Sequence, residues 1–412
     1  MAAAPPTRDR LKPYYGWVLV WALGITTIVS YGTTQYLFGV LVVPMQHDLG
    51  WSRALLSGAY SLAFAVSGLL GIPIGRLVDR RGARALMTAG SLLGAASLAL
   101  LSQVREPWHF YLLWAGGLGL AQALTFYPVT FTVITNWFLL RRGRALALLT
   151  LLGGLASVIF YPLAGVLIAH YGWRSALLVM AACQLAVGAP LHFFLLQRHP
   201  DEVRPDRPRE GLPLRPALAT GAFWALTASS GLGLLAHSVL LAHQVSYLIG
   251  RGFDPVFAAT AAGLLGLASL PSRVVMNLLS ERLGARGLLA VSASLQAAGV
   301  VLLIVAATPA LVWLYIAVYG FAFGAISPLR AAVTGEYFGR LAFGVITAAQ
   351  GLPAQVLGAV GPLAAGYLYD RQGNYTVALW LCVGAFAVSA LAVAVIPPGP
   401  ASSAPEPSPG GA

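Results

Sequence analysis

The sequence holds few charged residues. Of its 412 residues, 9% are Asp, Glu, Lys or Arg, and lysine occurs only once, as Lys12. A soluble domain carries about a quarter charged residues. The composition therefore excludes a soluble globular protein.

Cysteine and catalytic patterns are also scarce. The two cysteines, Cys183 and Cys382, lie in apolar runs, which argues against a disulfide framework and against a metal site. The apolar segments offer no paired carboxylates, no metal-ligand cluster and no P-loop, so we expect no enzyme, no cofactor and no metal. The N-terminal MAAAPPTRDRLKPYY lacks the short apolar core of a cleaved signal peptide.

Long apolar runs are abundant instead. Hydrophobic residues make up 58% of the chain. A run of about 18 residues or more can cross roughly 30 Å of hydrocarbon, and it must do so as a helix because the bilayer offers no water to the backbone. The sequence predicts an all-α membrane protein with twelve transmembrane helices, at 15–44, 53–75, 85–103, 109–138, 145–169, 174–196, 217–249, 256–279, 287–307, 310–337, 342–369 and 375–397.

The positions of the basic residues predict the orientation in the membrane. The N-terminal tail and the loops after the second, fourth, sixth, eighth and tenth helices hold 19 of the 25 basic residues, with Arg330 assigned to the last of these loops. Five arginines fall in the loops on the other side, and Arg273 alone remains. This bias places both termini in the cytoplasm. It also accounts for the net charge of +12 without a nucleic-acid partner.

The chain divides into two halves that repeat one another. Residues 197–216 contain five prolines and nine charged residues, which predicts an exposed linker. We expect a tail at 1–14, a six-helix bundle at 15–196, a second bundle at 217–397 and a disordered tail at 398–412. GRLVDRRGAR (75–84) matches NLLSERLGAR (277–286), and YPVTFTVITNWF (127–138) matches SPLRAAVTGEYF (327–338). Such a repeat predicts two pseudo-symmetric bundles with a transport site near the midplane between them.

One copy of the repeat carries a family signature. The pattern G-x-x-x-D-R-x-G-x-R at residues 75–84 resembles the loop 2–3 signature of the major facilitator superfamily. YYGWVLV (14–20), DLGWSRA (48–54), NWFLLRRGRALAL (136–148) and YGWRSA (171–176) resemble its branch of monocarboxylate porters and the bacterial oxalate–formate antiporter. The resemblance implies a latch for the outward-open state, built from Gly75, Asp79, Arg80, Gly82, Arg84, Glu281, Arg282 and Arg286. The alternative is that these arginines only set the topology.

Arg273 is the most unusual residue of the apolar segments. It lies about six residues, or roughly 9 Å, from the inner end of helix 256–279, and an arginine at a helix centre costs about 2.5–3.5 kcal/mol. Every other charged residue falls at a helix end or in a loop, so we expect the partner to be a carried carboxylate, which fits the guanidinium fork. The alternative is a structural arginine bonded to carbonyl groups or reaching toward Glu336.

The resemblance gives Arg273 the same role, because a helix 8 arginine binds the substrate carboxylate in these porters. This sequence departs from them in lacking a second cation in helix 342–369, which favours a monoanion. It also has Ser269 and Gln35 where mammalian-type porters have an aspartate and a lysine, so their proton carrier is missing.

Other candidates for the site are polar residues of the helices. His243 resembles a histidine common in the bacterial branch, and histidine titrates in the useful range. His237 competes with it as the proton-coupling residue, and Arg273 itself is a third candidate. Tyr127 stands at the substrate-tyrosine position of the resembling carriers. Gln35, Tyr319 and Gln355 are further candidates for lining the cavity.

The expected function is secondary active transport of small monocarboxylates such as lactate or pyruvate, with proton symport, by a monomer in the lipid bilayer. An exchanger of other organic anions, an exporter of apolar drugs and a transport-like sensor are the alternatives. GPLAAG (361–366) resembles a fragment of the drug-antiporter motif, but the fifth helix lacks that motif. The excess of arginine over lysine is typical of a GC-rich bacterial genome, which places the protein in an inner membrane.

Overall fold

The computed structural model describes residues 13–138, 141–197, 211–339 and 341–397. The chain forms two compact units. Unit 1 holds Met1–Arg204, Leu241–Leu267 and Pro362–Asn374, and unit 2 holds Pro205–Leu240, Ala268–Gly361 and Tyr375–Ala412. The expected C-terminal tail and most of the expected N-terminal tail and linker lie outside the described residues, whereas Pro13 and Tyr14, expected in the tail, belong to the first described helix.

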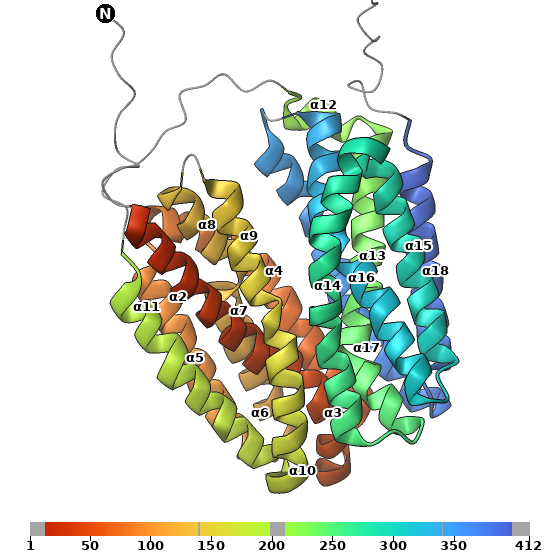
Figure 1. The fold of residues 1–412 in the computed structure, drawn as a ribbon. Coiled ribbons are helices and arrows are strands. Elements are labelled where there is room, and N and C mark those ends of the chain that lie inside the picture. Colours follow the sequence, from red (N-terminus) through yellow and green to blue (C-terminus); the bar gives the residue numbers. More distant parts are fainter. Residues whose placement is uncertain (1–12, 139–140, 198–210, 340, 398–412) are drawn as a thin grey trace, which may run out of the picture. The chain divides into compact units, whose positions relative to one another are not determined.

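The described residues are helical almost throughout (Figure 1). The helices before the linker are α2 (Pro13–Tyr31), η1 (Gly32–Tyr36), α3 (Leu37–Leu49), α4 (Arg53–Arg81), α5 (Arg84–Leu101), α6 (Pro107–Tyr111), η2 (Leu112–Leu118), α7 (Gly119–Thr125), α8 (Tyr127–Trp137), α9 (Arg142–Gly153), α10 (Leu155–Cys183), η3 (Gln184–Gly188) and α11 (Ala189–Leu195). Those after it are α12 (Leu214–Leu218), α13 (Gly221–Gly250), α14 (Pro255–Leu283), α15 (Ala285–Ile304), α16 (Pro309–Phe338), α17 (Phe343–Gln372) and α18 (Thr376–Ala394).

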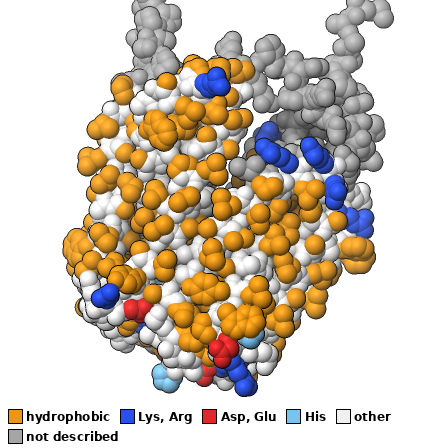
Figure 2. All heavy atoms as spheres, turned by 180° about the vertical axis from the view of Figure 1, so that it is seen from behind, with side chains coloured by type: hydrophobic (Ala, Val, Ile, Leu, Met, Phe, Trp, Pro, Cys, Tyr) orange, Lys and Arg blue, Asp and Glu red, His pale blue; other side chains and the backbone are white. Residues whose placement is uncertain are grey.

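Many of these helices have the length and apolar composition of membrane-spanning helices. Among the described residues, eleven helical stretches are long and apolar enough to span one. The longest, Arg142–Leu195, has 54 residues and contains Gly172, whose φ of 78° interrupts the helix. Hydrophobic side chains cover most of the face seen in Figure 2, and charged side chains gather toward its ends. Exposed Leu69, Val274 and Leu278 are more than 60% accessible, as lipid-facing residues would be.

The internal repeat is visible in the backbone. Gly82 ends α4 with a φ of 82°, and Gly284, 202 positions later, follows α14 with a φ of 80°. Only glycine adopts this conformation without a steric cost, so the match reflects one turn built twice. The same spacing of 202 residues recurs at the other end of these helices, where Ser52 and Asp254 cap the N-termini of α4 and α14 by accepting from backbone N–H groups three residues further on.

Two helical stretches of unit 1 are interrupted, one between α2 and α3 and the other between α7 and α8. A π-helical turn at Gly32–Tyr36 contains buried Gln35, and such turns are frequent at functional sites. Between α7 and α8, Phe126 is extended, with φ −81° and ψ 179°, and Pro128 follows in the first turn of α8. Proline suits this position because its missing N–H has no helical partner there. Gln35 and Tyr127 therefore both lie at irregular points of their helices.

Candidate functional site

Arg273 lies deeper in its helix than the expected six residues. The helix α14 continues to Leu283, so ten residues, about 15 Å of rise, separate the arginine from that end. Arg273 is half-buried and shares a face with Ser269 and Met276, which are 1% and 6% exposed. The other side of α14 is more than 60% exposed at Val274 and Leu278. Arg273 therefore does not belong to the outer, lipid-type face.

The expectation that Arg273 is the one cation within the apolar helices is wrong. Arg330 lies inside α16, eight residues before its end at Phe338, or about 12 Å of helix rise. It is half-buried. The loop count assigns Arg330 to the loop after this helix, although the predicted helix 310–337 already contains it, and α16 stays helical through the proline at 328 and beyond.

Three helices of unit 2 meet beside Arg273. His237 of α13 lies against α16, where its Nδ1 is 2.8 Å from the hydroxyl of Tyr319 and its ring stacks on Phe323 with centroids 4.1 Å apart. The next residue of α16, Gly324, faces α14. A Cβ on this glycine would lie 2.0 Å from the carbonyl oxygen of Ser269 and 2.3 Å from Ser272 Oγ. Residues 319–324 of α16 thus join His237 to the turn that precedes Arg273.

His243 belongs to unit 1 and is held by other residues. Its Nε2 is 3.0 Å from the carbonyl oxygen of Pro362 and 3.3 Å from Ser57 Oγ. The side chain is only 2% exposed. Of the two candidate histidines, His237 is therefore the one in the same unit as Arg273.

The remaining cavity candidates divide between the units. In unit 1, Tyr127 starts α8 with its ring 5.0 Å from that of Tyr31, and its hydroxyl lies over Gly153. Gln35 is 5% exposed in the π-helical turn. In unit 2, Tyr319 is 1% exposed, and the buried Oε1 of Gln355 has no hydrogen-bond partner among the described residues.

The signature residues make contacts within their own halves. The guanidinium of Arg84 lies 4.7 Å from the ring centroid of Phe193 in α11. At the equivalent position of the repeat, Arg286 donates to the carbonyl oxygen of Ile396, just beyond α18. Arg80 and Arg282 are exposed, and a Cβ on Gly75 would meet nothing within 4 Å. The side chains of Asp79 and Glu281 lie outside the described residues, so the expected latch stays a prediction.

Sequence reasoning missed a second polar cluster in unit 1, around Arg53. The carboxylate of Asp370 accepts from the backbone N–H groups of Arg53 and Ala54, at 3.0 and 2.8 Å. Arg53 Nε donates to Gln46 Oε1 at 2.8 Å, and its guanidinium lies 3.5 Å from the ring centroid of Tyr369. Asp370 thus caps the N-terminus of α4 from 317 positions away. Arg53 belongs to the phrase DLGWSRA, and the family resemblance of that phrase was the one feature of the sequence that pointed to this region.

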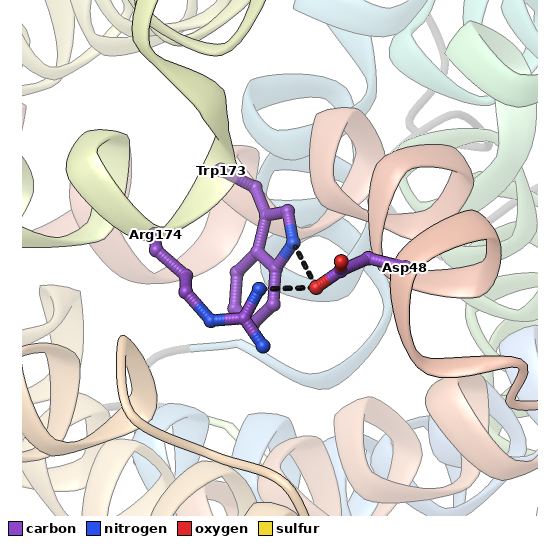
Figure 3. A network of polar contacts seen from close by, with 3 residues as sticks. All are labelled: Asp48, Trp173 and Arg174. Atoms are coloured by element: carbon purple, nitrogen blue, oxygen red, sulfur yellow. Dashed lines mark hydrogen bonds and ion pairs between the residues drawn. The ribbon is translucent and has the colours of Figure 1, made fainter.

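The same phrase contributes a third cluster at the end of α3. Asp48 accepts from Trp173 Nε1 at 3.1 Å and forms an ion pair with Arg174, whose guanidinium stacks on Trp173 (Figure 3). Trp173 and Arg174 belong to YGWRSA, so two phrases noted for their resemblance meet in space. The side chains of Asp48 and Arg174 are about two-fifths exposed, and surface ion pairs of this kind contribute about 0–1 kcal/mol.

Comparison with known proteins supports the family suggested by the signature. The model of the Major Facilitator Superfamily matches residues 23–356 and 267–412. Monocarboxylate transporter 13 of Bos taurus is 30% identical over 393 residues, covering 93% of this chain and 89% of the relative. Monocarboxylate transporter 11 of Homo sapiens is 28% identical, covering 89% and 80%.

Solved structures show the same fold. A bacterial homolog of the human lysosomal transporter Spinster matches with a TM-score of 0.72 at 17% identity, over 93% of this chain and 96% of that chain. The nucleoside transporter NupG matches with a TM-score of 0.74 at 14% identity, over 91% and 99%. This chain belongs to the Major Facilitator Superfamily and is a multi-pass membrane transporter, not an enzyme, that resembles the monocarboxylate porter branch.

Proposed function

We propose that this transporter carries small monocarboxylates, such as lactate or pyruvate, together with protons, and that Arg273 binds the carboxylate. The observation that carries the proposal is the position of Arg273, ten residues inside α14 and on its buried side. A cation there is costly unless an anion compensates it. A carried carboxylate supplies that anion and forms two parallel hydrogen bonds with the guanidinium.

The names of relatives support the substrate class. Two relatives that align over 89% or more of this chain are named monocarboxylate transporters. Because these relatives are similar proteins, we propose the same substrate class for this chain. We also propose that the protein works as a monomer and that it lies in a bacterial inner membrane. The excess of arginine over lysine supports the second of these two proposals.

The proposed mechanism is alternating access by two six-helix bundles with twelve transmembrane helices. The break at Gly172 supports the division of Arg142–Leu195 into two spans, because 54 residues would extend about 80 Å as one helix. The arginine-rich loops support cytoplasmic termini. The signature residues around Asp79 and Glu281 would form the latch at that side.

Proton coupling is assigned to His237. Its imidazole is paired with the hydroxyl of Tyr319 and joins the helix turn that precedes Arg273 through residues 319–324 of α16. An imidazole that gains a proton near a bound carboxylate is attracted to it, which favours loading both together. His243 is the weaker candidate because Pro362 and Ser57 already hold its Nε2.

Uptake of labelled lactate into proteoliposomes tests the function. With an inward proton gradient we expect uptake above that of empty liposomes, and we expect Arg273→Ala to abolish it. Arg215→Gln, which removes an exposed arginine from α12 of the same unit, serves as the control and should transport normally. Equal uptake by the wild type and Arg273→Ala would refute the assignment.

An exchanger of larger organic anions is the second candidate. It is favoured by Arg330, which adds a second cation to the helices of unit 2. Counterflow of an organic acid that does not respond to the proton gradient would select this function over proton symport.

A further inference from the structure

A histidine of unit 1 that the proposed transport site does not use joins α11 to α5, which lie side by side in Figure 1. His192 of α11 and Ser91 of α5 are both 0% exposed, and His192 Nδ1 is 2.9 Å from Ser91 Oγ. The backbone of Met87, one turn earlier on α5, also lies close to the ring. The buried Nε2 has no hydrogen-bond partner among the described residues. The imidazole is therefore held by uncharged groups of α5.

The helices are in close contact around this histidine. A Cβ on Gly188, in the π-helical turn η3 that precedes α11, would lie 2.9 Å from Ser91 Oγ and 2.9 Å from Gln184 Oε1. A Cβ on Gly94 of α5 would lie 3.2 Å from Gln184 Nε2. Because interiors packed in this way have no spare volume, the imidazole reaches water only when α11 moves away from α5.

The elements around His192 bring no carboxylate to it. The helix α11 packs mainly against α5, α2 and η3, and none of these four elements contains Asp or Glu. The one charged residue of α5 is Arg84, whose guanidinium lies 4.7 Å from the ring centroid of Phe193. From α2, the hydroxyl of Tyr15 donates to the carbonyl oxygen of Leu195 at 2.6 Å. A proton on the imidazole would therefore be a buried positive charge that no carboxylate of these helices balances.

This arrangement makes the contact between α11 and α5 sensitive to acid. Burial without an anion favours the neutral imidazole in the packed helices. Once α11 has moved away, the imidazole is in water and takes up a proton as a free histidine does, at a pH of about 6.5 and below. The loosened arrangement then binds more protons than the packed one, so the packing weakens as the pH falls through this range and is unaffected above it.

The proton reaches His192 from one side of the membrane. Three residues, about 4.5 Å of helix rise, separate His192 from the end of α11 at Leu195. The contact of Arg84 with Phe193 places the start of α5 at the same end. Arg84 belongs to an arginine-rich loop, and the distribution of such loops favours the cytoplasmic side.

The same end of α11 is connected to α2. The bond from Tyr15 to Leu195 ties the first turn of α2 to the last turn of α11. The helix α2 leads into the π-helical turn that contains Gln35, a candidate residue of the transport site. Loosening of α11 therefore also loosens a helix that the transport site depends on.

We propose that His192 is an inhibitory proton switch: acidification of the cytoplasm protonates it, releases α11 from α5 and slows transport. A carrier that brings protons in with its substrate acidifies the compartment that it fills, so this switch limits the activity of the carrier. The proposal rests on the proposed function for the direction of proton movement and for the cytoplasmic side, whereas the contact of His192 with Ser91 is independent of that function.

Hydrogen exchange of the purified protein in detergent tests the release of α11. Exchange is measured by mass spectrometry at pH 8 and pH 5.5, with labelling times scaled for the intrinsic rate of exchange. In the wild type we expect residues 84–91 and 189–195 to exchange about tenfold faster at pH 5.5, because this pH is one unit below that at which a free histidine is half-protonated. In His192→Gln, which takes up no proton, the scaled rates should be equal at the two pH values.

Two further variants separate the switch from a general effect of acid. His170→Gln removes an exposed histidine of α10 and should respond to acid as the wild type does. Ser91→Ala removes the hydroxyl but keeps the imidazole, so exchange in α11 should be faster at both pH values and the response to acid should remain. The wild type and Ser91→Ala test the switch even where His192→Gln does not fold.

Transport is measured as exchange of labelled lactate for lactate in proteoliposomes, with the same pH on both sides so that the orientation of the protein does not matter. The wild type and His192→Gln should exchange lactate equally fast at pH 8, and the wild type should be the slower of the two at pH 5.5. An equal loss of exchange in the two proteins at pH 5.5 would overturn the switch.

The switch would also be overturned by scaled exchange rates at residues 84–91 and 189–195 of the wild type that do not change with pH. That result alongside normal lactate exchange would leave the proposed function intact. Absence of lactate exchange by the wild type at pH 8, together with the expected response of α5 and α11 to acid, would instead refute the proposed function and keep the acid-sensitive contact.

Discussion

At the scale of single residues, the positions of two arginines of unit 2 differ in how easily they are predicted from the sequence. Arg273 interrupts a long apolar run, so its placement inside a helix follows from the sequence. Arg330 lies ten residues from Arg340, and a count of loop charges assigns both to one loop. The predicted helix 310–337 already contains Arg330, and the structure places it inside α16. A count of charges by loop therefore overlooks a cation that lies within a predicted helix.

The coupling role of His237 gives a prediction at this scale. In His237→Gln, the glutamine keeps a polar side chain beside Tyr319 but cannot take up a proton. We expect lactate uptake driven by a proton gradient to be lost, while exchange of lactate for lactate at equal pH continues. Both rates are measured in proteoliposomes with labelled lactate.

His243→Gln is the matched control for this experiment. It removes an imidazole bonded to the carbonyl group of Pro362 in unit 1, and gradient-driven uptake should persist. If His243→Gln uncouples transport and His237→Gln does not, the proton site has been assigned to the wrong histidine.

At the scale of helices, the contact of α14 with α16 sets the position of Arg273. In Gly324→Ala, the added Cβ would lie 2.0 Å from the backbone oxygen of Ser269, and the helices must separate to relieve the contact. Overpacking of this kind costs about 1–3 kcal/mol. We expect a lower melting temperature and slower lactate uptake.

Gly335→Ala is the control on the same helix. Its added Cβ would be 3.9 Å from the nearest atom, in Phe343, so melting temperature and uptake should stay near those of the wild type. Identical behaviour of the two alanine variants would show that the glycine contact does not hold α14 in place.

The cap that Asp370 provides to α4 gives a second prediction for helices. Asp370→Ala leaves the N–H groups of Arg53 and Ala54 without their acceptor, and loss of a cap costs about 0.5–2 kcal/mol. Because Asp370 belongs to α17, we expect faster hydrogen exchange both at residues 53–57 and at residues 362–372, measured by mass spectrometry.

Asp254→Ala removes a cap that is local to α14, where Asp254 accepts from the N–H of Phe257. Faster exchange should then be confined to the first turn of α14. Unchanged exchange at 362–372 in Asp370→Ala would contradict the link between α4 and α17.

The sequence predicts the helices well because each is an apolar run, and the repeat predicts matching turns. Gly82 and Gly284 share a rare backbone conformation at a spacing of 202 residues, as the alignment of their motifs implies. The pairing of Asp370 with α4 could not be predicted, because it depends on how two elements separated by more than 300 residues pack. The same holds for His237 and Tyr319, which are 82 positions apart.

At the scale of the whole molecule, family membership and site chemistry rest on different observations. The fold follows from the apolar helices, the matched family model and the similar solved structures. Those structures are no more than 17% identical to this chain, so they carry no substrate with them. The substrate class depends on the cations of unit 2 and on the relatives of the monocarboxylate porter branch.

Binding of lactate to Arg273 variants tests the central claim most directly. Calorimetric titration of the wild type, Arg273→Lys and Arg273→Ala measures the Kd with no contribution from coupling or membrane orientation. We expect at least tenfold weaker binding for the lysine variant, because a point charge replaces a bidentate fork, and no measurable binding for the alanine variant. Equal Kd values for all three proteins would contradict the claim that Arg273 holds the carried carboxylate.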